Sequence, residues 1–269
     1  MLKKDKVEGI IVDSYYVSSE YLAALSNVCK TVYIDDIFSL DQYPVDYLIN
    51  YNIYGKKLDY KSKCLPNTKL LLGPNYAPLR KEFQNIKPIL RKEVKSVFIS
   101  TGGADKYNIA GKILSEVIKN NNQDYMDMEF HVISGAMNKN LIYLLNLQSN
   151  NKGIYIHQNV SNMSEIMQLC DIAVSACGST MYELCACGLP IITYSFADNQ
   201  LPGVKGFEEE GVALNCGDVR DGIDDVVGKI LENVVKLKND SNLKEKLSFK
   251  ALNVIDGRGV KRIVDICFM

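Results

Sequence analysis

A stretch in the C-terminal half of the chain combines small side chains, hydroxyls and a carboxylate in a pattern that suits a phosphate ligand. Residues 171–200 read DIAVSACGSTMYELCACGLPIITYSFADNQ. An apolar run at 172–174 leads into the small-residue turn 175–178, and Thr180 is followed by Glu183 three residues later. A hydroxyl and an acid at this spacing are typical of the first turn of a helix. The sequence therefore predicts a strand, a turn and a helix N-terminus, where free N–H groups and the helix dipole hold phosphate.

The polar residues of this turn each have two explanations. Ser179 and Thr180 could donate hydroxyls to a diphosphate, or Thr180 could simply cap the helix. Glu183 lies one turn inside the helix and could accept both hydroxyls of a ribose. It could equally be the acidic half of a capping box with Thr180. The residues alone leave both explanations open.

Two further segments place small or polar residues where predicted strands end. Gly102 and Gly103 follow a predicted strand at 97–100, which suits either a phosphate turn or a structural tight turn. They lack the full dinucleotide fingerprint, G-x-G-x-x-G with an acid about twenty residues on. A predicted strand at 191–194 is followed by a polar triplet. Such residues line the ligand crevice of an open α/β sheet, although they also favour ordinary turns. The triplet is Asp198, Asn199 and Gln200.

Other candidate residues carry weaker signals. Tyr15 follows a predicted strand at 7–13 and could face a ligand or be a half-buried aromatic. The two histidines, His131 and His157, lie in strand-like runs, where a structural role is commoner than a catalytic one. Two close cysteines in the CAC run at 185–187 have no nearby histidine. A zinc site needs four ligands, so we expect no metal site.

Composition restricts the class of protein. The chain has 269 residues, 47% of them hydrophobic, which is enough for one large domain or two ordinary ones. A net charge of −1 predicts no general attraction to nucleic acid or acidic lipid. No apolar run is long enough for a transmembrane helix, and the run at 10–12 is too short for a signal peptide. Eight scattered cysteines without an export signal are typical of a reduced, cytoplasmic protein.

Strands and helices alternate along the chain, which predicts an α/β protein with parallel sheets covered on both faces. Only about ninety residues precede a polar, basic segment at 87–95, the predicted interdomain linker. These residues hold fewer strands than a complete Rossmann-type domain needs. A second αβ domain starts at Ser96, and its first helix is predicted at 106–120. The remaining predicted strands are 31–35, 45–50, 70–72, 129–133, 154–157 and 212–214.

Six motifs in a fixed order resemble the UDP-sugar hydrolase of pseudaminic acid biosynthesis and its relatives among the spore-coat polysaccharide proteins. The resemblance covers nearly the whole chain. The pieces at 72–83 and 197–200 are fairly specific, whereas the glycine turn is not. The motifs are DSY at 13–15, LGPNYAPLRKEF at 72–83, STGGAD at 100–105, GSTMYE at 178–183, ADNQ at 197–200 and DGRG at 256–259.

The resemblance implies a GT-B-like fold of two Rossmann-like domains, similar to the glycosyltransferase that adds GlcNAc to the lipid II precursor. It implies a sugar-side domain at 1–92, a nucleotide-binding domain at 93–269, and a UDP-sugar substrate without a metal cofactor. Glu183 matches the ribose-binding glutamate, and Ser179 and Thr180 match the diphosphate turn. Tyr15 and Asn199 match residues that face the sugar and the attacking water, and are the catalytic candidates. The other candidate nucleotide contacts are Gly102, Gly103, Gly178, Asp198 and Gln200.

One departure from this family is large. The first strand of the family is followed by a G-x-G-H loop whose histidine serves as the base, and this chain has no such segment. We therefore expect an incomplete N-terminal domain. Either the gene is truncated, the missing piece is a separate chain, or the protein is a binding remnant, and a partner chain or a second copy could complete the domain. Three activities stay open: a UDP-sugar hydrolase of surface polysaccharide or nonulosonic acid biosynthesis, a GT-B glycosyltransferase, and a non-catalytic UDP-sugar-binding subunit.

Overall fold

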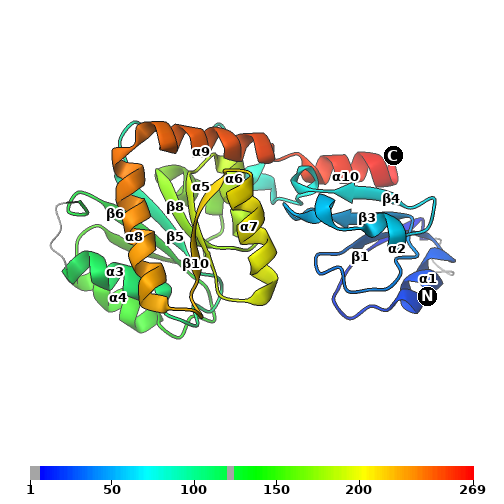
Figure 1. Ribbon diagram of the computed structural model, residues 1–269, viewed down its shortest axis with the longest axis horizontal. Coiled ribbons are helices and arrows are strands. Elements are labelled where there is room, and N and C mark those ends of the chain that lie inside the picture. The colour runs from blue at the N-terminus through cyan, green and yellow to red at the C-terminus, as the bar shows by residue number, and fades with distance from the viewer. Residues whose placement is uncertain (1–6, 120–123) are drawn as a thin grey trace. The chain divides into compact units, whose positions relative to one another are not determined.

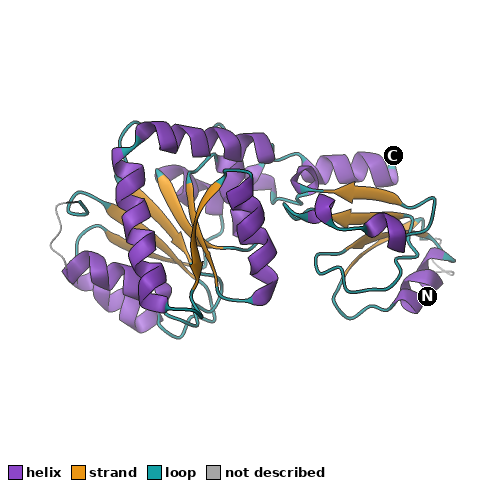
Figure 2. Ribbon diagram, viewed as in Figure 1, coloured by secondary structure: helices purple, strands orange, loops and turns teal. Residues whose placement is uncertain are grey.

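The computed structural model describes residues 7–119 and 124–269, and the chain forms two compact units (Figure 1). Unit 1 consists of residues 1–79 and 257–269, and unit 2 of residues 80–256. Each unit has its own parallel sheet flanked by helices (Figure 2), which confirms the predicted α/β class. The assignment of a sugar-side domain to residues 1–92 and of a nucleotide-binding domain to residues 93–269 stays a prediction. Asn120, the predicted end of the first helix of the second domain, lies outside the described residues.

Unit 1 is built on a four-stranded parallel sheet. Its elements are β1 (Gly9–Asp13), α1 (Ser19–Ser26), β2 (Lys30–Ile34), β3 (Tyr47–Asn50), α2 (Tyr60–Lys63), β4 (Lys69–Leu72) and α10 (Gly259–Phe268). The strands lie in the order β1-β2-β3-β4. One face packs against α1 through Leu22 and Leu25, and Val32 and Ile49 on the other face pack against α10. The C-terminal helix therefore completes the core of the unit that begins the chain.

Unit 2 is built on a six-stranded parallel sheet. Its elements are β5 (Ser96–Ser100), α3 (Ile109–Lys119), β6 (Glu129–Ser134), α4 (Leu141–Asn150), β7 (Ile154–Gln158), α5 (Met163–Leu169), β8 (Ile172–Ala176), α6 (Thr180–Cys187), β9 (Ile191–Ser195), α7 (Leu201–Glu209), β10 (Ala213–Asp218), α8 (Ile223–Asn239) and α9 (Ser241–Val254). The strand order is β10-β9-β8-β5-β6-β7. Beginning at β5, the chain adds β6 and β7 on one side and then β8, β9 and β10 on the other. The strand order therefore reverses between β5 and β8, and ligands of open α/β sheets bind at such a point.

The central strands of unit 2 carry its core. Every residue of β5, β8 and β9 is buried, as expected for the middle of a parallel sheet. One face packs against α3 and α8, through side chains such as Ile113, Leu114 and Ile230. α6 ends at Gly188, whose φ of +69° is the left-handed value that glycine adopts without strain. Gly188 therefore ends α6 without backbone strain.

Helix α3 begins three residues later than the prediction of Lys106, because the backbone before it is not helical. Asp105 and Asn108 have positive φ values of 40° and 53°. The Asp105 carboxylate instead accepts hydrogen bonds from the N–H groups of Ile109 and Ala110, at 2.8 and 3.2 Å. These bonds cap the helix and hold the preceding glycine turn in place.

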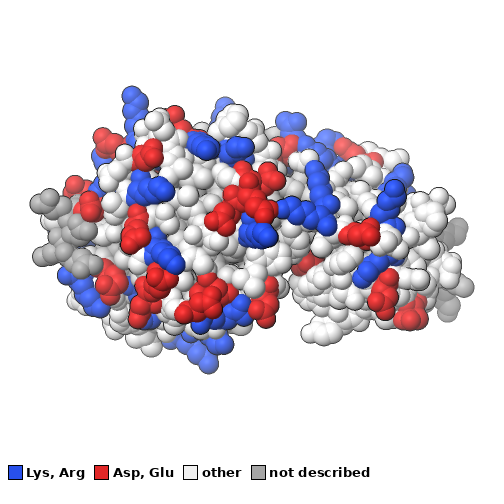
Figure 3. All heavy atoms as spheres, in the orientation of Figure 1, with Lys and Arg blue, Asp and Glu red and all other residues white. Residues whose placement is uncertain are grey.

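The described part of the chain shows no helix that is both long enough and apolar enough to cross a bilayer. All eight cysteines are unpaired, and six of them are buried. Acidic and basic side chains are mixed over the face drawn in Figure 3, with neither sign dominating.

Candidate functional site

The carboxyl edge of the unit 2 sheet brings three of the predicted segments together. Ser100 at the end of β5 pairs in register with Ser175 of β8, so the turns that follow these strands are neighbours. Gly102 has a φ of +82°, and a side chain added there would lie 3.7 Å from the Phe196 ring, just after β9. The glycine turn at 102–103, the turn at 177–179 and the loop after β9 therefore meet where the strand order reverses.

The amino end of α6 is open. Ser179 is the cap residue, yet its backbone is helical and its side chain makes no capping bond. Gly178 and Ser179 are exposed, and a Cβ added to Gly178 would meet no heavy atom within 4 Å. Within the described residues, the N–H groups of Ser179 and Thr180 have no acceptor. Unpaired N–H groups at a helix N-terminus are the arrangement that binds a phosphate.

Glu183 does not form the capping box that is one explanation of the sequence. Its Oε1 accepts hydrogen bonds from Nε and Nη2 of Arg80, at 3.1 and 2.9 Å. The Glu183 side chain is only 15% exposed. Burial raises the pKa of this carboxyl above its ordinary value, and the Arg80 charge opposes that rise. Its other oxygen, Oε2, makes no hydrogen bond within the part of the chain that the structure describes.

The three residues after β9 have different surroundings. Asp198 is exposed and forms an ion pair with Arg220 at 2.7 Å. Gln200 accepts a hydrogen bond from the Phe196 N–H at 2.9 Å through its side-chain oxygen, which closes the loop. Asn199 is exposed, and its side chain makes no hydrogen bond to any described residue. Of the triplet, Asn199 is thus the residue whose side chain has no hydrogen-bonding partner among the described residues.

Tyr15 belongs to unit 1, where it follows β1. Its hydroxyl donates a hydrogen bond to Oδ2 of Asp36 at 2.7 Å, and its side chain is largely exposed. This bond to a carboxylate raises the pKa of the Tyr15 phenol well above its ordinary value. Burial raises the pKa of Asp36 as well, although Tyr15 opposes that shift. Asp36 was visible in the sequence only as an acid at the end of a predicted strand.

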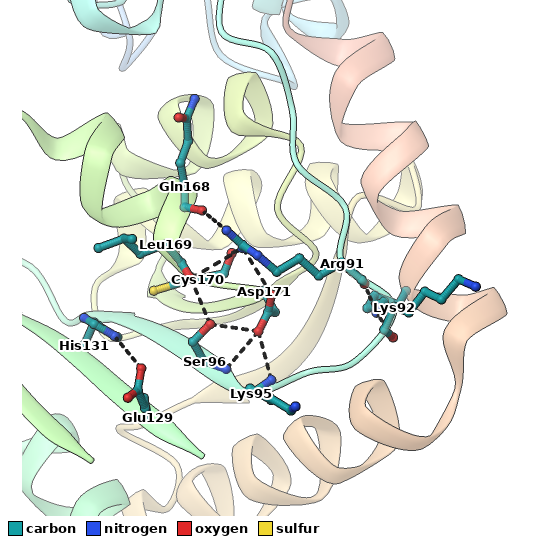
Figure 4. Close-up of polar contacts among 11 residues, drawn as sticks. Arg91, Lys92, Lys95, Ser96, Glu129, His131, Gln168, Leu169, Cys170 and Asp171 are labelled. Carbon is teal, nitrogen blue, oxygen red and sulfur yellow. Dashed lines mark hydrogen bonds and ion pairs between the residues drawn. The ribbon is translucent and has the colours of Figure 1, made fainter. Parts of the chain in front are cut away.

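The two histidines lie next to each other on β6 and β7. Nδ1 of His131 is 3.1 Å from Nε2 of His157, and the two rings are within 9° of parallel. Nε2 of His131 lies 3.7 Å from the Glu129 carboxylate (Figure 4). Burial lowers the pKa of both imidazoles. Each histidine thus has a local partner, two and three strands away from β8.

A second polar cluster, at the start of β5 and β8, involves a residue that the sequence analysis did not single out. Asp171 is buried, and its Oδ2 accepts hydrogen bonds from the Lys95 and Ser96 N–H groups and the Ser96 hydroxyl, at 2.8 to 2.9 Å. Arg91 contacts Oδ1 at 3.2 Å and also donates to the Gln168 carbonyl (Figure 4). This cluster lies at the amino ends of the strands, opposite the sheet edge where α6 begins. It holds the chain in place as it enters β5.

Comparison with known proteins finds distant homologues of this chain. No protein-family model matches it. It is 23% identical over 225 residues to the Bacillus subtilis spore coat polysaccharide biosynthesis protein SpsG, covering 82% of this chain and 64% of SpsG. It is 31% identical over 121 residues to the UDP-2,4-diacetamido-2,4,6-trideoxy-beta-L-altropyranose hydrolase of Campylobacter jejuni, covering 44% of this chain and 43% of the hydrolase.

An uncharacterised protein of Methanocaldococcus jannaschii is 27% identical over 202 residues, which are 71% of this chain and 41% of that protein. The chain therefore spans about two fifths to two thirds of the lengths of these curated relatives. The sequence resemblance to SpsG and to UDP-sugar hydrolases is confirmed as distant homology.

Solved structures show the same fold at low identity. MurG of Acinetobacter baumannii matches with a TM-score of 0.60 and 13% identity, over 99% of this chain and 74% of MurG. S. aureus MnaA, in a co-structure with UDP, matches with a TM-score of 0.62 and 12% identity, over 98% of this chain and 76% of MnaA. The chain has the GT-B fold, as the motifs implied.

Proposed function

We propose that this chain binds a UDP-sugar, with the pyrophosphate on the amino end of α6 and the ribose hydroxyls on Glu183. The observation that carries the proposal is the uncapped helix start. Free N–H groups, an exposed glycine and a carboxylate one turn deeper occur together where the strand order reverses. Distant homology to UDP-sugar hydrolases supports UDP as the nucleotide.

We propose hydrolysis as the reaction. Water attacks the anomeric carbon of the sugar and releases a proton to the solvent, the bond from that carbon to the diphosphate oxygen breaks, and UDP leaves with its negative charge at the α6 N-terminus. Fixed N–H groups stabilise such a developing charge without reorganising. Tyr15 and Asn199 are our candidates for contacting the sugar and the water. Their expected signature is a lower turnover rate in Tyr15→Phe and Asn199→Ala, with UDP affinity unchanged.

A second candidate function is UDP-sugar binding without turnover. The observation that favours it is the histidine pair. The only two histidines of the chain lie beside each other on β6 and β7, two and three strands from β8, so no histidine lies at the start of α6 to act as a general base. A general base normally contributes 10²- to 10⁴-fold to such a reaction. The two functions differ in one measurement, the release of UDP from candidate UDP-sugars over time.

Binding is tested by calorimetry with UDP on the purified chain and on Glu183→Gln. Losing a hydrogen bond to a charged group costs about 1.5–3 kcal/mol, so the variant should bind about ten- to a hundredfold more weakly. Glu208→Gln is the matched control, because this exposed carboxylate of α7 accepts a hydrogen bond from Asn215 and from no other side chain that the structure describes. Equal affinities in all three proteins would remove Glu183 from the site, and no UDP binding at all would reject the proposal.

A further inference from the structure

Arg80 makes the contact with Glu183 that no local sequence pattern indicated. The two residues are 103 positions apart, and both N–H groups of Arg80 that reach Glu183 converge on the same oxygen, Oε1. The geometry leaves Oε2 to accept hydrogen bonds from a ligand. An arginine in this position can orient a carboxylate as well as balance its charge.

Arg80 is itself held from two other directions. Its Nη1 lies 3.2 Å from Oε1 of Glu82, which also accepts the Met163 N–H at 3.0 Å. Its guanidinium lies over the ring of Phe83, 5.3 Å from the centroid, and Phe83 is buried. The guanidinium therefore reaches Glu183 from a fixed position, and little side-chain freedom is left to lose when a ligand binds.

The ion pair adds little to folding stability. The Arg80 side chain is 45% exposed, and ion pairs at such exposed positions contribute little to stability. Glu183, in contrast, is largely buried in the first turn of α6, where an uncharged carboxyl would accept ribose hydroxyls poorly. The pair thus has more effect on the state of Glu183 than on the stability of unit 2.

We propose that Arg80 is a positioning residue for ribose recognition: it holds Glu183 ionised and turns Oε2 toward the two ribose hydroxyls. This inference rests on the proposed UDP-sugar site. Burial and the nearby Glu82 both raise the pKa of Glu183, and Arg80 is the group that lowers it. Without Arg80, the carboxylate is lost at a higher pH, and ribose recognition is lost with it.

The test compares UDP with 2′-deoxy-UDP. Both nucleotides carry the same diphosphate, so the effect of diphosphate protonation on binding cancels in the ratio of their dissociation constants. We expect the chain to prefer UDP by about tenfold or more at pH 8, as for one hydrogen bond to a charged group. Arg80→Gln should reduce this preference several-fold, and the preference should disappear at a higher pH than in the unaltered chain. Arg80→Lys keeps the charge but not the paired N–H groups. The pH at which its preference disappears should therefore be close to that of the unaltered chain, whereas the size of its preference for UDP should stay reduced.

Lys229→Gln is the control, because it breaks an exposed ion pair with Asp225 on α8. Thermal unfolding and circular dichroism show that each variant is folded, and Arg80→Lys carries the test if Arg80→Gln does not fold. If Glu183→Gln loses the ribose preference and Arg80→Gln keeps it at every pH, the positioning role is wrong and the site stands. An equal loss for both nucleotides would mean that Arg80 contacts phosphate instead. No ribose preference in the unaltered chain, or none lost in Glu183→Gln, would reject the proposed ribose contact itself.

Discussion

The substitution Gly178→Val tests the open helix start most directly. Gly178 is exposed, its φ lies outside the left-handed region, and a Cβ there would meet no heavy atom within 4 Å. The fold should therefore tolerate the valine, with a change in unfolding free energy within about 0.5 kcal/mol. The same side chain would project next to the free N–H groups of Ser179 and Thr180. A phosphate could then no longer reach both of them.

The expected loss of affinity follows from the bonds removed. Two N–H groups donating to an anionic oxygen contribute about 1.5–3 kcal/mol each, so losing both corresponds to at least about a hundredfold weaker binding. Gly178→Ala adds a smaller group and should lose less. The assay is calorimetry with UDP, accompanied by thermal unfolding of each variant.

The matched control is Gly228→Val on α8, where an added Cβ also meets nothing within 4 Å. It should leave UDP affinity unchanged. If Gly178→Val folds normally and binds UDP as tightly as the unaltered chain, the pyrophosphate does not bind at the start of α6. The reasoning that leads from an uncapped helix to a nucleotide site would then be wrong.

Three further predictions concern stability. Asp171→Ala should lower the unfolding free energy by about 3–5 kcal/mol in urea titrations, because it removes the buried carboxylate that accepts from the Lys95 and Ser96 N–H groups and pairs with Arg91. Gly259→Ala should destabilise the chain by about 1–3 kcal/mol, since the added Cβ would lie 2.1 Å from the Ala77 carbonyl oxygen; an unchanged melting temperature would contradict this packing. Arg220 lowers the pKa of Asp218 to about 2, so this pair stabilises the fold above the ordinary Asp pKa near 3.9 and loses that effect as the pH falls toward about 2. The stability difference between the unaltered chain and Arg220→Gln should therefore be constant above about pH 5 and vanish at lower pH, whereas a difference independent of pH would exclude the pair as its source.

Local patterns were enough to predict most elements. The apolar runs at 97–100, 172–174 and 191–194 correspond to β5, β8 and β9, all of them buried. Burial on both faces of a parallel sheet requires continuous apolar runs, and such runs are visible without a structure. The start of α3 was predicted too early, because the positive φ values of Asp105 and Asn108 leave only a weak trace in residue types.

The candidate site was predicted unevenly for the same reason. The glycine turn, the small-residue turn before α6 and the acid within it are local features of the sequence. Whether Glu183 caps the helix could not be decided locally, because its carboxylate contacts Arg80 in a different part of the chain. Arg80 was present in the quoted motif at 72–83, but nothing in the motif says what it contacts.

The sequence alone determined that this protein alternates strands and helices and has a strand, turn and helix suited to a phosphate near residue 180. Those features depend on residues within about one or two helical turns of each other, so periodicity and turn chemistry reveal them. The tertiary structure decided which turns are neighbours, through the strand order that sets β5 beside β8. It also decided which charges meet, as Arg80 with Glu183 and His131 with His157. Pairings of this kind depend on how distant segments pack, so the spacing of residues along the chain does not predict them.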